Sequence, residues 1–324
     1  MKAVLCKSYG PPESLVVEDI SDPVVGKGEI LTEVTAASLN FFDTLIIQGK
    51  YQVKPQLPFS PGAEYAGRVV EVGEGVSGFA PGDRVMAYAG FGACREKMVA
   101  DASRHVPIPD GVSDEVASGL IVTYGTSIHG LRDRANLQPG ETLAVLGASG
   151  GVGVSAIEIG KAMGARVIAC ASSDEKLAFC KEHGADEGIN YSKQNLKEAL
   201  KAATDGKGAD VIYDPVGGDF SEAALRATAW GGRFLVIGFA TGEIPRIPLN
   251  LTLLKGCSVM GVFWGSFIAR DPAGYLANNK QILDWVLEGK LKPHVHGVYP
   301  LDKTSDAIGA IARREVMGKL VVKP

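Results

Sequence analysis

The sequence lacks the features that mark secreted and membrane-spanning proteins. Only five widely spaced cysteines occur in 324 residues, which indicates neither a disulfide framework nor a C-x-x-C metal site. No stretch approaches the roughly 20 apolar residues that span a bilayer. The N-terminus shows no apolar core of a signal peptide. We therefore expect a cytoplasmic protein with reduced thiols and no metal site.

Clusters of basic residues are also missing. The formal net charge is -4 at pH 7, and no block rich in Lys and Arg appears. Binding to a phosphate backbone needs a clustered basic surface, so nucleic acid is not an expected partner. What is present is a globular composition, with 46% hydrophobic and 22% charged residues. A chain of this length has room for two domains.

The pattern of the chain changes near residue 112. Before it, short β-type runs are broken by Gly and Pro, which predicts a compact antiparallel barrel. After a helix expected over residues 113–135, apolar strands alternate with helical stretches, which is typical of βαβ units around a parallel sheet. We expect an α/β protein with a barrel domain over 1–120, a nucleotide-binding domain over 121–264, and a return to the first domain over 265–324.

A glycine-rich turn, A-x-G-x-x-G, follows the first strand of the expected parallel sheet. It consists of Ala148, Ser149, Gly150, Gly151, Val152 and Gly153. A diphosphate needs a backbone that it can approach closely and a helix N-terminus with free N–H groups. Because the turn lies between a predicted strand and a predicted helix, it predicts a dinucleotide site.

The end of the next strand bears on the choice of nucleotide. Dinucleotide sites specific for NAD usually carry an acidic residue at the end of this strand. This chain instead has Ala171, then Ser172 and Ser173, with Lys176 nearby. Two hydroxyls and an ammonium suit a 2′-phosphate. Asp174 opposes this interpretation unless it caps the helix that begins there. We favour NADPH over NADH.

Taken together, several motifs resemble those of the medium-chain dehydrogenases/reductases, and in particular the zinc-independent NADPH:quinone oxidoreductase branch. The motifs are "ASLNFFDTLIIQGKY", "PFSPGAEYAGRVVEVGEGV", "PGDRV", "GASGGVG", "GADEGINY", "DPVGG" and "GKLVVKP". The resemblance implies a GroES-like barrel joined to a Rossmann domain, with the active site between them. It also implies that Asn40 and Ala63 occupy the positions of the Cys and His zinc ligands of zinc-dependent relatives, and neither fits that role.

The resemblance assigns further site residues. It implies a nicotinamide-pocket role for Thr123 and a substrate-side role for Asn40 and Tyr51. Each has an alternative: Asn40 can cap a helix, Tyr51 can pack a loop, and the Thr123 hydroxyl can bond to its own helix. Asp43 and Glu64 could form an acid/base pair, but we favour supporting or structural roles for both, since hydride transfer requires no proton relay. The remaining expected cofactor contacts are Lys176, Tyr191 and Arg314 at the 2′-phosphate, and Gly238, Phe239, Phe263, Trp264 and Gly265 in two loops near the nicotinamide, where the aromatic rings can instead be packing.

These features predict an NADPH-dependent quinone reductase that acts on a small-molecule substrate without zinc. Reduction of a C=C bond in an enone or 2-alkenal is the alternative, and a non-catalytic NADPH-binding scaffold or RNA-binding protein is an alternative of another class. Leu45 departs from the Tyr that quinone reductases often carry at this position, which weakens the choice of quinone. The segment "SVMGVFW" is expected to pair with its counterpart in a homodimer.

Overall fold

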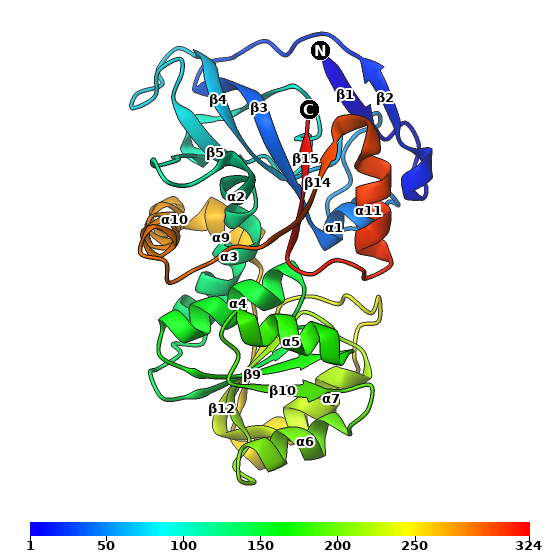
Figure 1. Ribbon diagram of the computed structural model, residues 1–324, viewed down its shortest axis with the longest axis vertical. Helices are drawn as coiled ribbons and strands as arrows, with labels where there is room; N and C mark the ends of the chain where they lie inside the picture. Colours follow the sequence, from blue (N-terminus) through cyan, green and yellow to red (C-terminus); the bar gives the residue numbers. More distant parts are fainter. The chain divides into compact units, whose positions relative to one another are not determined.

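The computed structural model describes residues 1–324, which form two compact units. The first unit consists of residues 1–122 and 293–324, and the second of residues 123–292. Figure 1 shows the elements of both units along the chain. The second unit is therefore an insertion in the first, and the α/β fold class predicted from the sequence is confirmed.

A seven-stranded sheet forms the centre of the first unit. Its strands run in the order β14-β15-β3-β4-β5-β7, and β6 also pairs with β3. All of these pairs are antiparallel except β14 with β15. A separate hairpin-like pair joins β1 and β2. The strands are β1 (Lys2–Leu5), β2 (Val16–Asp19), β3 (Glu29–Leu39), β4 (Glu64–Val72), β5 (Arg84–Tyr88), β6 (Lys97–Asp101), β7 (His105–Pro107), β14 (Val295–Pro300) and β15 (Lys319–Lys323).

Short helices close this unit, and apolar residues from distant parts of the chain pack beneath them. One core cluster joins Val4, Leu39, Ile46, Ile308 and Leu320, so the first and last strands share a core. The helices are α1 (Phe41–Ile46), α2 (Asp114–Ser118) and α11 (Thr304–Ala312).

The second unit contains a six-stranded parallel sheet in the order β10-β9-β8-β11-β12-β13. In chain order this is 3-2-1-4-5-6, the Rossmann arrangement, whose switch point lies between β8 and β11. Side chains on both faces of the central strands β8, β9 and β11 are buried, as their apolar sequences predicted, whereas the edge strands β10 and β13 are partly exposed. The strands are β8 (Thr142–Leu146), β9 (Arg166–Ala171), β10 (Glu187–Asn190), β11 (Ala209–Asp214), β12 (Thr228–Val236) and β13 (Ser258–Gly261).

Helices cover the two faces of this sheet. On one face, Gly160 of α4 lies against Leu143 and Val167, and Leu177 of α5 lies against Gly188. On the other face, residues of α6, α7 and α8 form one core cluster with residues of the strands. These helices are α4 (Gly151–Ala162), α5 (Asp174–Glu182), α6 (Leu196–Ala203), α7 (Asp219–Arg226) and α8 (Asn250–Lys255).

The single helix expected over residues 113–135 is wrong, because the chain breaks at Gly119. The segment forms α2, then α3 (Leu120–Ile128) and a π-helical turn (His129–Arg134). Gly119 ends α2 with φ -103° and ψ 1°. A Cβ on Gly119 would lie 3.2 Å from Cε of Lys319 and 3.3 Å from Oγ of Ser38. The break therefore lies where the backbone approaches the Lys319 side chain closely.

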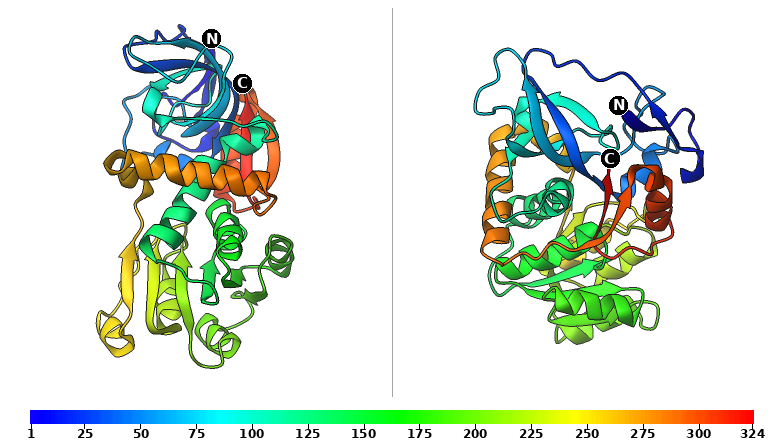
Figure 2. Two further views of the ribbon diagram at one scale, coloured as in Figure 1. Left: turned by 90° about the vertical axis from the view of Figure 1, so that its left-hand side faces the viewer. Right: turned by 45° about the horizontal axis from the view of Figure 1, so that its top comes forward.

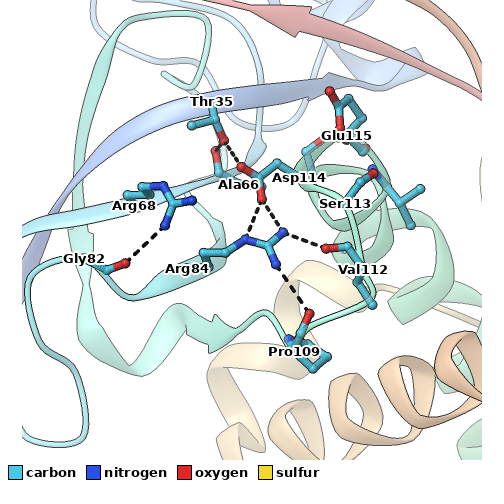
Figure 3. A network of polar contacts seen from close by, with 12 residues as sticks. Thr35, Ala66, Arg68, Gly82, Arg84, Pro109, Val112, Ser113, Asp114 and Glu115 are labelled. Carbon is cyan, nitrogen blue, oxygen red and sulfur yellow. Dashed lines mark hydrogen bonds and ion pairs between the residues drawn. The ribbon is translucent and has the colours of Figure 1, made fainter.

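A polar network fixes the start of α2 to the strands of the first unit (Figure 3). Arg84 on β5 donates through Nε and Nη2 to Oδ1 of Asp114, and through Nη2 to the carbonyl of Val112. Oδ2 of Asp114 accepts from the hydroxyl of Thr35 on β3 at 2.7 Å. Two N–H groups of Arg84 on one oxygen of Asp114, with the Thr35 hydroxyl on the other, hold the first turn of α2 against β5 and β3.

Residues 265–292 lie with the second unit, and the expected return at residue 265 differs from the observed division at residue 293. This segment contains α9 (Trp264–Arg270) and the long helix α10 (Pro272–Leu287), seen side-on in orange in the left view of Figure 2. The Asn278 amide on α10 donates to Oδ2 of Asp133 at 3.0 Å, and Phe267 stacks on His129. These contacts hold both helices to the π-helical turn. None of the helices has the length and apolar character needed to cross a bilayer.

Candidate active site

The glycine turn lies where the sequence placed it, between β8 and α4 at the switch point of the parallel sheet. Gly147 has φ +56°, in the left-handed region that favours glycine. A Cβ on Gly153 would lie 2.4 Å from the carbonyl oxygen of Gly147, so the first turn of α4 packs directly on the turn before it. Gly150 is the N-cap residue of α4, and the first N–H groups of a helix have no acceptor within it. The backbone therefore fits a diphosphate.

The loops after β11 and β12 lie side by side at the same end of the sheet. Asp214 is buried, and its carboxylate accepts from the N–H groups of Val216 and Gly217 and from the hydroxyl of Ser221. Burial raises the pKa of Asp214, and these donors oppose the shift. The N–H of Gly238 donates to the carbonyl of Asp214 at 3.3 Å. The Phe239 ring lies against Gly217, because a Cβ added to Gly217 would lie 3.0 Å from that ring.

All the residues expected at the 2′-phosphate except Arg314 lie at the ends of β9 and β10. Lys176 Nζ lies 3.5 Å from Oγ of Ser172. The Ser173 hydroxyl, and not Asp174, caps α5 by accepting from the N–H of Lys176. Tyr191 follows β10, and its N–H donates to the carbonyl of Ala171. Two hydroxyls and an ammonium thus lie close together within the second unit, and the backbone of Tyr191 lies beside the end of β9.

Asp174, the residue that opposed this interpretation, is engaged elsewhere. Its Oδ1 accepts from the amide of Asn190 at 2.6 Å, and its Oδ2 pairs with Nζ of Lys193 at 2.6 Å. The hydrogen bonds from Lys193 and Asn190 lower the pKa of Asp174. Its charge is therefore balanced locally.

The nicotinamide-side residues of the second unit differ in exposure. Thr123 on α3 is buried, and its carbonyl accepts from the hydroxyl of Ser155. Phe263 is 61% exposed, whereas Trp264 is only 6% exposed. The Trp264 ring packs over Gly125 and edge-on to Tyr275, as the packing alternative expected. Gly265 follows it in α9.

In the first unit, Asn40 is the N-cap residue of α1 and is tied to a buried carboxylate. Its N–H donates to Oδ2 of Asp43 at 2.7 Å, and the N–H of Gly62 donates to Oδ1 at 2.9 Å. Asp43 is fully buried. Burial raises its pKa to about 6, opposed by the two N–H groups and the charge of Lys319, while the Glu64 charge adds to the rise. Because both oxygens accept backbone hydrogen bonds, the geometry favours the anion at neutral pH.

The side chain of Asn40 lies between two opposite charges. Its Oδ1 accepts from Nζ of Lys319 at 2.6 Å, and its Nδ2 donates to Oε1 of Glu64 at 2.9 Å. Lys319 also donates to Oε1 of Glu64 at 2.9 Å and to the carbonyl of Leu39 at 2.8 Å. Oε2 of Glu64 accepts from the N–H of Val122 at 2.8 Å. A cation on one side and an anion on the other fix which way the amide points.

Sequence reasoning missed Lys319. A lysine that begins the strand "KLVVK" looks like a solvent-facing strand end, yet Lys319 is buried and pairs with a fully buried Glu64. The signal that could have revealed it is the continuous apolar run that follows. Such a run indicates that both faces of the strand are covered, which leaves a lysine at its start within reach of the core.

Tyr51 and Arg314 also belong to the first unit. Tyr51 stacks on Phe42 at 5.2 Å between ring centroids, and burial together with the charge of Asp43 raises its pKa. Leu45 lies within α1, the helix that Asn40 caps. Arg314 follows α11 with φ +61°. The roles expected for Tyr51 at the substrate and for Arg314 at the 2′-phosphate stay predictions.

The residues at the expected zinc position do not fit a zinc ion. Both polar atoms of Asn40 are already bonded, and its oxygen faces the ammonium of Lys319. Ala63 is buried and offers no side-chain donor. The chain holds no group of three or more His, Cys, Asp or Glu side chains placed to bind a metal. A zinc ion at Asn40 would lie beside a positive charge, so we derive no step through a metal.

Comparisons with known proteins agree with this architecture. Residues 26–110 match the model of the alcohol dehydrogenase GroES-like domain, and residues 151–279 match that of the zinc-binding dehydrogenases. A quinone oxidoreductase-like protein 2 homolog of Nematostella vectensis is 40% identical over 99% of this chain and 88% of that protein. An acryloyl-coenzyme A reductase of Metallosphaera sedula is 32% identical over 99% of each chain.

A solved structure extends the agreement to the whole fold. The Escherichia coli quinone oxidoreductase, determined in complex with NADPH, superposes with a TM-score of 0.94 at 28% identity, covering 100% of both chains. The chain therefore belongs to the medium-chain dehydrogenase/reductase superfamily, in its quinone oxidoreductase branch, and is an oxidoreductase.

Proposed function

We propose that the protein reduces quinones, or similar conjugated acceptors, with NADPH and without zinc. The observation that supports this most directly is the Asn40 amide, held between Lys319 and Glu64 at the position where zinc-dependent relatives carry a Cys ligand. A quinone spreads the negative charge that hydride addition creates. Hydrogen-bond donors can then stabilise that charge without a metal.

The bound nicotinamide supplies a hydride, and the chain binds and orients the two reactants. The N-terminus of α4 would hold the diphosphate of the cofactor, and Ser172, Ser173 and Lys176 would hold its 2′-phosphate. Thr123 would contribute to the nicotinamide pocket. An Nδ2–H of Asn40 donates to the acceptor oxygen, and solvent or a hydroxyl supplies the proton that balances the hydride.

Reduction of an activated C=C bond is the second candidate, because an acryloyl-coenzyme A reductase is among the relatives. Both reactions place negative charge on an oxygen conjugated to the carbon that receives the hydride. The same amide donor serves either one, so the acceptor is decided by the shape of the pocket.

We expect 1,4-naphthoquinone to accelerate NADPH oxidation more than a matched enone does, with kcat/KM about tenfold higher, because the quinone spreads the developing charge further. Stopped-flow absorbance of NADPH with each acceptor measures this. A higher value for the enone would favour C=C reduction. No acceleration by any quinone would reject the proposal.

A homodimer joined through β13 is also proposed. β13 is the last strand of the parallel sheet, and Val259 on it is 44% exposed. Leu253 and Leu254 on the neighbouring helix α8 are also exposed. An open strand edge beside apolar side chains is a pairing site, and a two-fold axis brings the same edge of a second copy against it.

Replacing Val259 by lysine is expected to convert the dimer to a monomer, because two ammonium groups would face each other across the axis. Light scattering over a range of concentrations measures the mass. Val70→Lys is the control, since Val70 on β4 is 43% exposed and lies outside the proposed interface. A wild-type protein that is monomeric at all concentrations would contradict the dimer.

A further inference from the structure

Lys319 has a charge and contacts that the reaction, as proposed so far, does not use. Its ammonium has three N–H groups and three acceptors, the carbonyl of Leu39, Oδ1 of Asn40 and Oε1 of Glu64. With every N–H engaged and the side chain only 7% exposed, it is not placed to give a proton to a substrate. Its effect must act through the groups that it touches.

The contact with Asn40 has a chemical consequence. An ammonium 2.6 Å from the amide oxygen withdraws electron density from the amide, which makes its N–H groups stronger donors. One N–H of Nδ2 is engaged by Glu64, and the amide has a second. The cation and the carboxylate also prevent the amide from rotating, because a rotated amide would point its NH2 group at Lys319 and its oxygen at Glu64.

We propose that Lys319 is a positioning residue that orients and polarises the Asn40 amide, so that its remaining N–H acts as the hydrogen-bond donor to the acceptor oxygen. This inference rests on the proposed function. It assigns to a fixed ammonium, acting through a neutral amide, the stabilisation of charge that a metal ion supplies in zinc-dependent relatives. Glu64 pairs with the charge of Lys319 and accepts a hydrogen bond from the other end of the amide.

The backbone around Lys319 leaves room for its side chain and supplies one of its hydrogen-bond acceptors. Gly119 interrupts the helical segment where a Cβ would lie 3.2 Å from Cε of Lys319. Leu39, which accepts the third hydrogen bond, ends β3 and directly precedes Asn40. The ammonium is therefore held by the same turn that presents the amide.

The test measures kcat and KM for 1,4-naphthoquinone, and NADPH affinity by fluorescence, in Lys319→Met. We expect kcat to fall about tenfold with unchanged NADPH affinity, because only stabilisation of the developing charge is lost. Lys323→Met, on the same strand but with an exposed side chain, is the matched control and is expected to keep full activity. Since Lys319→Met leaves Glu64 unpaired in the core, Lys319→Met/Glu64→Gln is measured beside it as a neutral pair.

A second comparison separates positioning from general stabilisation. In an Asn40→Ala background, adding Lys319→Met is expected to lower kcat no further, because the effect of Lys319 passes through the amide. A tenfold loss in that background, or an unchanged kcat in both Lys319 variants of the natural Asn40 protein, would overturn the proposal.

An NMR readout keeps this inference distinct from the proposed function. With ¹⁵N-labelled asparagine, the side-chain signals of Asn40 are identified by their loss in Asn40→Ala. We expect them to shift in Lys319→Met/Glu64→Gln relative to Glu64→Gln, as the polarising charge is removed. Signals that do not move would overturn the inference. An inactive wild-type protein whose signals do move would reject the proposed function alone.

Discussion

Gly153→Ala is expected to abolish measurable NADPH binding and to lower the free energy of unfolding by about 3 kcal/mol. The added Cβ would lie 2.4 Å from the carbonyl oxygen of Gly147 and 2.7 Å from the backbone of Ala148. Both atoms belong to the backbone, so a side-chain rotation cannot relieve the overlap. The first turn of α4 must move away from β8, and its N–H groups then no longer converge on a diphosphate. Isothermal titration calorimetry and thermal melting measure the two effects.

Gly150→Ala is the matched control for this substitution. A Cβ there would lie 3.5 Å from the carbonyl of Gly147, an ordinary contact, and its φ of -74° suits alanine. We expect a melting temperature close to that of the natural protein. Equal destabilisation by the two alanines would show that packing at Gly153 is not the cause.

Lys176→Met is expected to weaken NADPH binding roughly 30-fold, about 2 kcal/mol, and to leave NADH binding almost unchanged. The ammonium lies beside Ser172 at the end of β9, where it provides the positive charge for a 2′-phosphate that NADH lacks. The long aliphatic chain of methionine preserves the packing on α5. Titrating both nucleotides into both proteins by fluorescence measures the difference.

One matched control accompanies this substitution. Lys181→Met, on an exposed part of the same helix, removes an equal charge and is expected to change neither affinity. Ala171→Asp is less informative, because Ala171 is buried and a carboxylate there carries a desolvation cost of its own. Equal loss of NADPH and NADH affinity in Lys176→Met would mean that Lys176 does not contact the 2′-phosphate.

Local patterns were sufficient to predict the parallel sheet and its glycine turn. Most strands of that sheet contain a short apolar run bounded by turn residues, and Ala148–Gly153 joins one such run to a helix, as the structure confirms. The order of the strands was not predicted, because it depends on which strands pair across the sheet. The cluster of Ser172, Ser173 and Lys176 could also be predicted from the sequence, since these residues are neighbours in the chain.

Features that depend on distant contacts could not be predicted in this way. The helix breaks at Gly119, where the backbone lies against the buried Lys319 side chain, but 200 residues separate the two in the chain. The sequence left two roles open for Trp264, stacking on a flat ligand or packing, and only the structure shows that its ring packs over Gly125. The segment with α9 and α10 lies with the second unit because of contacts such as that of Asn278 with Asp133, which no local pattern reveals.

The Asp43 carboxylate braces the turn at Asn40 directly to the backbone at Gly62. The chain between these two anchors includes Tyr51 and a long irregular stretch with several exposed residues. Lengthening or reshaping that stretch would therefore leave the Asn40 amide in place, since its anchors lie outside the stretch. Relatives could thus acquire new acceptors by diversifying a loop while inheriting an unchanged chemical centre.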